Sequence, residues 1–185
     1  MSLERGSPLR VRELYSVRAV DERIAALARE LARALAGSEP LIVVIAEGAL
    51  RFAQRLAERL AELGVRAERT FVRARRSRGL ELVPVELEGC EPARFAGRDV
   101  VIADDIADEG RTLEAVCARV REGSPRSLRT IVLVSKLSRR RVPLALDHVG
   151  FEVARGWVVG FGMDLDEKYR ELDWLGVVEG TEELE

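Results

Sequence analysis

The hydrophobic pattern near the start of the chain predicts a helix, a buried strand and a second helix. Apolar residues recur three and four positions apart between Asp21, the expected N-cap, and Gly37, where the helix ends. These apolar positions are Ile24, Leu27, Ala28, Leu31 and Leu35. The run Leu41–Ile45 is apolar at every position, which is typical of a parallel strand covered on both faces. A second amphipathic helix is predicted from about Ala49 to Gly64.

The rest of the chain repeats this alternation of strands and helices. Predicted strands lie at Arg66–Val72, around Leu80 and Leu82, and at Asp99–Ala103, Ile131–Val134, Val149–Val153 and Trp157–Phe161. We expect a loop at Arg73–Gly79 and a helix at Thr112–Arg121. The alternation favours an α/β fold with a mostly parallel, doubly wound sheet flanked by helices, in one domain over residues 1–185. Ligands of such sheets bind beyond the carboxyl ends of the strands.

Composition narrows the class of protein. Hydrophobic residues make up 47% and charged residues 34%, which is typical of a globular protein. No apolar run approaches the roughly 20 residues that span a bilayer, and the first residues lack the apolar core of a secretory signal. We therefore expect a cytoplasmic protein with no membrane contact. Cys90 and Cys117 make neither a disulfide framework nor a zinc motif. Only Lys136 and Lys168 are lysines and asparagine is absent, a bias that fits a heat-adapted source or genomic base composition.

The most specific chemistry lies in the acidic turn Asp104–Arg111, between a buried strand and a helix. Backbone N–H groups in such a turn, with the helix N-terminus, form a cradle for a phosphate. The paired carboxylates of Asp104 and Asp105 can bind ribose hydroxyls or hold magnesium, because hard cations prefer oxygen ligands. The turn therefore predicts a site for a phosphorylated ribose. The alternative is an acidic, solvated turn that caps a helix.

This turn resembles the signature with which phosphoribosyltransferases bind phosphoribosyl pyrophosphate (PRPP). The signature has an apolar strand, two acidic residues, two spacers, Asp, Thr, Gly, any residue and Thr. The chain matches it at Asp104, Asp105, Asp108, Gly110 and Thr112. The resemblance implies a type I phosphoribosyltransferase fold in which Asp104 and Asp105 face the ribose and Mg²⁺ and Asp108 is the general base near purine N7. It further implies that the 5′-phosphate is held by Ala107, Asp108, Glu109, Gly110, Arg111 and Thr112.

A second match, downstream, resembles the hypoxanthine-guanine branch of this family. It comprises the basic segment from Lys136, the strand at Val149–Val153 and the segment Trp157–Arg170, in the same order and at similar spacing. The resemblance implies that Lys136 donates to the purine O6, Trp157 stacks on the base and Val158 offers backbone groups to its edge. It also implies that Asp164 serves Mg²⁺, while Arg170 and the turn Glu47–Gly48 bind pyrophosphate.

The chemistry of these residue types agrees with those roles. A protonated lysine donates to a carbonyl oxygen and rejects an adenine amino group, because two buried donors would then face each other. Lys136 persists in an arginine-rich chain, which supports a need for a compact charge. Three alternatives stay open: Lys136 is a surface lysine, Trp157 is a core aromatic, and Arg170 pairs with Asp166 or Glu167 on the surface.

Three departures from the family pattern fall on functional loops. The turn Ala46-Glu47-Gly48 carries glutamate where the family usually has a lysine that binds pyrophosphate. Glu109 stands where a threonine commonly touches the 5′-phosphate, so its carboxylate must point away or weaken binding. The segment Arg73–Gly79 lacks the tyrosine of the mobile catalytic loop, and its arginines either capture pyrophosphate or form a solvated basic loop.

The resemblance covers roughly residues 12–178 and implies a small hood from about 10–20 and 150–178. It implies an enzyme that joins hypoxanthine or guanine to PRPP on Mg²⁺ and that forms a homodimer or homotetramer. We expect the acidic tail Glu179–Glu185 to fray.

Two other functions stay open. One is a regulator of the same fold that binds PRPP or a nucleotide with little or no catalysis. The other, which we rank last because a nucleic-acid partner is not expected, is RNA binding through Arg73–Arg78 and Arg139–Arg141.

Overall fold

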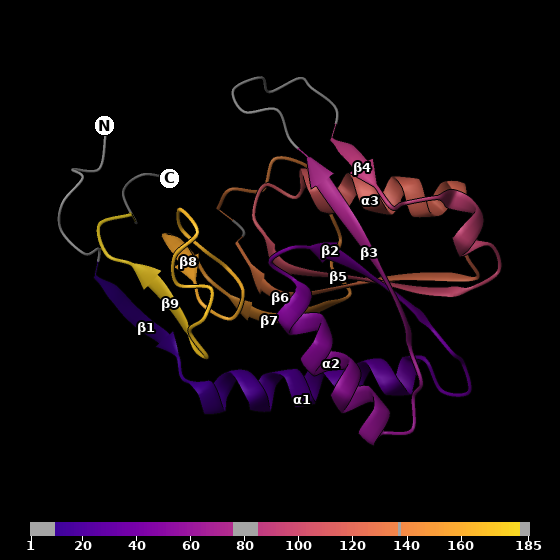
Figure 1. The fold of residues 1–185 in the computed structure, drawn as a ribbon, viewed down its shortest axis with the longest axis horizontal. Coiled ribbons are helices and arrows are strands. Elements are labelled where there is room, and N and C mark those ends of the chain that lie inside the picture. Colours follow the sequence, from indigo (N-terminus) through magenta and orange to yellow (C-terminus); the bar gives the residue numbers. More distant parts are fainter. Residues whose placement is uncertain (1–9, 76–84, 137, 182–185) are drawn as a thin grey trace.

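The computed structural model describes residues 10–75, 85–136 and 138–181 and contains two sheets (Figure 1). In chain order its elements are β1 (Val11–Tyr15), α1 (Val17–Ala34), β2 (Leu41–Ala46), α2 (Leu50–Glu62), β3 (Glu68–Arg75), β4 (Glu86–Glu88), the 3₁₀ helix η1 (Pro92–Phe95), β5 (Asp99–Ala107), α3 (Arg111–Glu122), β6 (Ser127–Ser135), β7 (His148–Glu152), β8 (Trp157–Val159) and β9 (Leu175–Val178). The larger sheet has the strand order β4-β3-β2-β5-β6-β7, and the smaller has the order β1-β9-β8.

The larger sheet confirms the predicted doubly wound topology. Its strands are parallel except for β4, which runs antiparallel to β3 at the edge. From β2 the chain passes through α2 to β3 on one side, and from β5 it passes through α3 to β6 on the other. The winding direction therefore reverses between β2 and β5, and the crevice at their carboxyl ends is where such sheets bind ligands.

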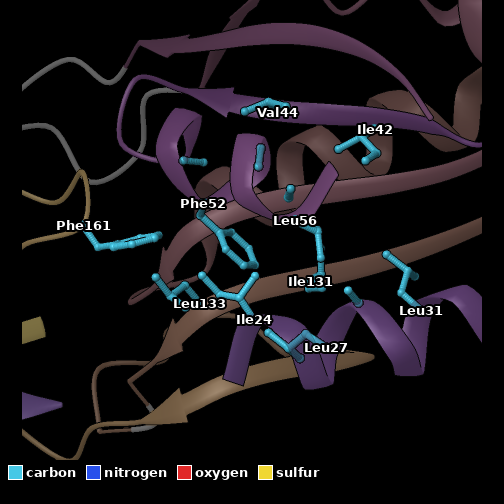
Figure 2. Packing of buried hydrophobic residues seen from close by; sticks show 14 of the residues in the cluster. Ile24, Leu27, Leu31, Ile42, Val44, Phe52, Leu56, Ile131, Leu133 and Phe161 are labelled. Atoms are coloured by element: carbon cyan, nitrogen blue, oxygen red, sulfur yellow. The ribbon is translucent and has the colours of Figure 1, made fainter. Parts of the chain in front are cut away.

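Helices cover both faces of this sheet. Side chains of β2 alternate, so Ile42 and Val44 pack toward α1 and α2, whereas Val43 packs toward α3 and η1. Figure 2 shows the first of these two layers, which includes Phe52 of α2 and Leu133 of β6. Burial of these large apolar side chains on both faces holds the carboxyl ends of the strands in register.

Two element boundaries differ from the prediction. Helix α1 begins at Val17 rather than after Asp21, because the Ser16 hydroxyl caps it by accepting from the Ala19 N–H at 3.3 Å. Strand β5 continues through both carboxylates to Ala107, because this segment pairs with β6 as far as Ser135. The predicted turn is therefore reduced to the three residues between β5 and α3.

The segment predicted as an arginine-rich loop begins as a strand. Arg73 and Arg75 belong to β3, which is held between β2 and the unpredicted edge strand β4. Residues 76–84 lie outside the described part of the chain, so the predicted strand around Leu80 and Leu82 and the rest of the loop are not described.

The smaller sheet is built from both ends of the chain, as Figure 1 shows for β1 and β9. Strand β7, which includes the first residues of the hood expected from residue 150, belongs to the larger sheet. Below, the hood denotes the smaller sheet and the segments that join its strands β8 and β9. Sequence analysis found neither β1 nor β9. Among the described residues no helix is long and apolar enough to cross a membrane.

The tail expected to fray is anchored as far as Thr181. The Glu179 N–H donates to the Arg10 carbonyl at 2.9 Å, and the Thr181 hydroxyl, which is buried, accepts from the Trp157 N–H at 2.8 Å. Residues 179–181 therefore form a turn that is hydrogen-bonded to the smaller sheet, while the rest of the tail, residues 182–185, lies outside the described range.

Candidate active site

Neighbouring strand ends bring Asp108 and Lys136 together. Strands β5 and β6 are parallel, with Ala107 opposite Ser135, and the Lys136 N–H donates to the Ala107 carbonyl at 3.0 Å. Asp108 and Lys136 are the first residues after these two strands, and Lys136 Nζ lies 3.9 Å from Asp108 Oδ1. Two residues that lie far apart in sequence thus face each other because their strands are adjacent.

A first cavity, of about 290 Å³, surrounds the turn after β5. It is lined by Ile45, Ala46, Ala74 and every residue from Asp104 to Leu113. Gly110 is the N-cap of α3 with a φ of 86°, and no side chain caps the helix. A helix N-terminus without a side-chain cap presents N–H groups to an anion. All six residues expected at a 5′-phosphate therefore line one cavity.

The paired carboxylates lie on the floor of this cavity. Burial raises the pKa of Asp104 well above its ordinary value, and the neighbouring Asp105 carboxylate raises it further. Burial also raises the pKa of Asp105, and the charge of Asp164 adds to this shift. Among the described residues neither Asp104 nor Asp105 makes an ion pair, so this pair is suited to a cation and hydroxyl donors from a ligand.

Gly48 closes the same crevice from β2. A Cβ at this position would overlap the Asp105 carboxylate, so a side chain here would require Asp105 to move. Gly162 in the hood packs in turn against the Gly48 carbonyl, which a Cβ would also overlap. The turn after β2 is thus enclosed between the larger sheet and the hood.

A second cavity, of about 210 Å³, lies between β5 and the hood. It is lined by Asp105, Ile106, Asp108, Lys136, Trp157, Val158, Met163 and Asp164. Lys136 is only 2% exposed, and its Nζ donates to the Gly156 carbonyl at 2.9 Å. Lys136 is therefore not a surface lysine, and its charge lies at the bottom of a cavity.

Trp157 is not a core aromatic. Its side chain is 44% exposed on the wall of this second cavity, and its Nε1 donates to the Asp164 carbonyl at 2.8 Å. This hydrogen bond orients the ring from within the hood. The cavity thus combines an aromatic wall, a buried ammonium group and carboxylates, which is the composition of a small polar-ligand site.

A third cavity, of about 740 Å³, extends from the turn after β2 to β3 and the hood, and Glu47, Gly48, Arg73 and Arg170 are among its lining residues. Arg170 pairs with Asp164 at 3.1 Å and with Glu47 at 3.6 Å, and not with either of its expected surface partners. The residues expected at pyrophosphate therefore line one cavity. Within it, however, the Glu47 carboxylate pairs with the Arg170 guanidinium.

Glu109 is also paired. Its carboxylate lies 3.7 Å from Nε of Arg111 and 3.6 Å from Nη2 of Arg139, and Nη1 of Arg139 lies 3.5 Å from Asp108 Oδ2. Two guanidinium groups thus offset the charge that sequence analysis identified as a departure. Arg141 reaches the same turn through its backbone, since its N–H donates to the Glu109 carbonyl at 3.0 Å.

Comparison with known proteins decides the family. The chain matches the family described as the phosphoribosyl transferase domain over residues 10–166. It is 30% identical to the hypoxanthine-guanine phosphoribosyltransferase of Mycobacterium avium, over 90% of this chain and 84% of that protein. The chain belongs to the hypoxanthine-guanine phosphoribosyltransferase family. The crystal structure of such a protein from Bacillus anthracis superimposes with a TM-score of 0.80 at 26% identity, over 93% of this chain and 99% of the other.

A longer bifunctional protein is also among the relatives. The chain is 32% identical to the bifunctional protein TilS/HprT of Listeria innocua over 89% of its own length, but it spans only 25% of that protein. A phosphoribosyltransferase unit of this size therefore occurs both as most of a protein and as one quarter of a longer one.

Sequence analysis did not identify several residues that line these cavities, Met163 of the second cavity among them. It did not single out Ile106, although its place inside the acidic motif was a signal, nor Arg51 of α2, which lines the third cavity. It placed Arg139 in the basic segment of the family match and, only in the last-ranked alternative, in a run that binds RNA. Arg139 instead pairs with the phosphate turn, and Nη2 of Arg140 donates to the Ser135 hydroxyl at 3.2 Å, so these arginines contact the site rather than form a separate basic surface.

Proposed function

We propose that this chain is a purine salvage phosphoribosyltransferase that transfers the phosphoribosyl group of PRPP to a 6-oxopurine base, hypoxanthine or guanine. The products are the nucleoside monophosphate and pyrophosphate. The observation that carries the proposal is the position of Asp108 and Lys136, which lie 3.9 Å apart. Asp108 lines both the first cavity, assigned to the phosphate, and the second cavity, beside the hood. A base in the hood cavity then lies beside a ribose phosphate in the cradle.

In this proposal the turn after β5 binds the phosphorylated ribose. The cradle from Ala107 to Thr112 receives the 5′-phosphate on backbone N–H groups and the start of α3. Asp104 and Asp105 face the ribose hydroxyls, whose donors compensate the burial of the two carboxylates.

Mg²⁺ fits these residues as a metal shared with the substrate. The described part of the chain contains no group of three or more His, Cys, Asp or Glu side chains that could hold a metal by themselves. Mg²⁺ is commonly bound through one or two carboxylates together with substrate phosphates and water, and Asp104, Asp105 and Asp164 offer such carboxylates on two sides of the crevice. When bound, the ion would neutralise charge on the departing pyrophosphate.

The hood cavity would select the base. Lys136 is held by the Gly156 carbonyl with its ammonium group in the cavity, and it can donate to the O6 of a 6-oxopurine. An adenine amino group would face a buried donor instead. Trp157 would stack on the base, and Val158, the next residue of β8, would meet its edge.

The reaction is a displacement at ribose C1. A purine ring nitrogen forms the bond to C1, the bond from C1 to the pyrophosphate oxygen breaks, and the base loses a proton. Asp108 would assist this proton transfer as the general base near N7, and Arg170 would stabilise the charge of the leaving pyrophosphate. No covalent intermediate with the protein is required.

A turnover assay tests this function. Pyrophosphate release is measured with PRPP, Mg²⁺ and each purine in turn, for the wild-type chain and for Asp108→Ala and Lys136→Ala. We expect release with hypoxanthine or guanine and a decrease in kcat/KM of about 100-fold or more in each variant. Undiminished turnover in both variants would contradict the proposed roles of these two residues.

A regulator that binds PRPP or a nucleotide is the second candidate, and the glutamate at position 47 favours it, since it reverses a charge at the expected pyrophosphate turn. Thermal stabilisation by GMP or PRPP without purine-dependent release of pyrophosphate would support the regulator. For either function we propose a cytoplasmic homodimer or homotetramer, which sedimentation equilibrium measures directly.

A further inference from the structure

An ion pair joins two residues that line the cavity assigned to pyrophosphate. Glu47 follows β2, Arg170 belongs to the hood, and both line the cavity of about 740 Å³ together with Gly48, Arg51 and Arg73. The Glu47 carboxylate lies 3.6 Å from Nη1 of Arg170. This pair joins the larger sheet to the hood across the cavity in which the departing group would lie.

Both terminal nitrogens of Arg170 are engaged. Nη2 lies 3.1 Å from Asp164 Oδ1, and the other oxygen of Asp164 accepts from the Glu167 N–H at 2.8 Å. Asp164 is therefore anchored within the hood turn and holds the guanidinium in place. A guanidinium binds phosphate oxygens through the same donors that it offers to carboxylates, so Glu47 occupies a position that a phosphate oxygen needs.

The two contacts of Arg170 differ in how easily they open. The Glu47 side chain is 63% exposed, whereas that of Asp164 is 29% exposed. An exposed pair is weak because water and salt screen it, so a bound anion can displace Glu47 while Asp164 stays in place.

We propose that Glu47 competes with pyrophosphate for Arg170 and so lowers the affinity of the pyrophosphate subsite. Pyrophosphate, free or as part of PRPP, has to displace the Glu47 carboxylate to reach the guanidinium. Glu47 then weakens pyrophosphate binding and favours release of the product. The inference rests on the proposed function, because that function assigns the cavity to pyrophosphate.

The test compares affinities for magnesium pyrophosphate by isothermal titration calorimetry in the wild-type chain, Glu47→Gln, Arg170→Met and the double variant. Glu47→Gln keeps the size of the side chain and removes its charge, and we expect its Kd to fall about three- to tenfold. In the Arg170→Met background the same change should alter Kd by less than about twofold, because the partner is absent. Glu88→Gln, which removes another carboxylate of the same cavity, is the matched control and should change Kd by less than about twofold.

An unchanged or higher Kd in Glu47→Gln would overturn the proposal. It would also be overturned if Glu88→Gln tightened binding equally, or if the effect persisted without Arg170, since both results indicate a general charge effect. A different result would contradict the proposed function: the wild-type chain would release no pyrophosphate in a purine-dependent manner. The calorimetric comparison measures binding alone and is decided independently of that assay.

Discussion

Acidic side chains at this site are matched by arginines that come from other elements. Asp108 and Glu109 leave the end of β5, and Arg139 reaches both of them from the turn after β6. Arg139 is 32% exposed and Glu109 is 23% exposed, so their charges interact in a partly desolvated setting. In the proposed function the arginine compensates for a glutamate that would otherwise repel the 5′-phosphate.

Removal of Arg139 should therefore weaken PRPP binding through Glu109. We expect Arg139→Ala to raise the KM for PRPP about three- to tenfold, because the Glu109 carboxylate is then less neutralised beside the cradle. The double variant Arg139→Ala with Glu109→Gln should recover most of this loss. Arg141→Ala is the control, since Arg141 contributes its backbone N–H to the Glu109 carbonyl. Steady-state kinetics measures all four proteins, and failure of the double variant to recover would contradict the charge argument.

At the scale of elements, side chains also fix where adjacent strands begin. Asp99 opens β5 and accepts from Arg126 Nε at 3.1 Å and from the Ser127 hydroxyl at 2.7 Å, at the start of β6. The Arg126 guanidinium, together with Ser127, holds the pKa of Asp99 well below its ordinary value, although burial opposes this shift. This pairing sets the register that later places Asp108 beside Lys136.

The contribution of Asp99 to stability should depend on pH. Because its folded pKa lies below the unfolded value of about 3.9, the stabilisation is complete above that value and is lost as the pH falls toward the folded pKa. We expect Asp99→Asn to lower the free energy of unfolding by about 1–3 kcal/mol at pH 7. The difference from the wild-type chain should shrink below about pH 4. Urea denaturation at several pH values measures this, and a difference that stays constant to pH 3 would contradict it.

At the scale of the whole molecule, Arg51 of α2 makes several contacts between the larger sheet's helical layer and the hood. Nη1 of Arg51 donates to the Leu172 carbonyl at 2.9 Å, and its Nη2 pairs with Asp173. The guanidinium carbon also lies 4.8 Å from the ring centre of Phe161. Since Trp157 and Val158 reach the base cavity from the hood, the position of the hood decides whether that cavity exists.

Replacement of Arg51 should loosen the hood. We expect Arg51→Met to lower the free energy of unfolding by about 1–2 kcal/mol and to raise the KM for the purine. Hydrogen exchange should quicken in residues 157–178. Arg55→Met is a matched control on the same helix, because Arg55 pairs with Asp21 and Glu58 instead of the hood. Equal exchange rates in the hood of both variants would exclude the proposed role of Arg51.

The acidic motif and the hydrophobic periods were enough to predict most of the strands and helices and the candidate phosphate-binding turn from the sequence alone. The run Leu41–Ile45 and the motif from Asp104 to Thr112 are local patterns, and local patterns carry strand, helix and cradle information within a few residues. The alternation of these elements also predicted the doubly wound sheet. The ends of the elements were predicted less well. Strand β5 extends to Ala107 because it pairs with β6, and the motif itself does not encode that pairing.

Only the tertiary structure decided which distant charges meet. Glu47 lies beside Arg170, and Glu109 beside Arg139, because strand order and the docking of the hood bring separate segments together. Strand β1 likewise pairs with β9, and β9 also pairs with β8, so the short sequences of β1 and β9 carried little signal by themselves. The sequence determined the kinds of groups at the site through short-range patterns. The pairing of those groups depends on packing between elements far apart in the chain, which no local pattern encodes.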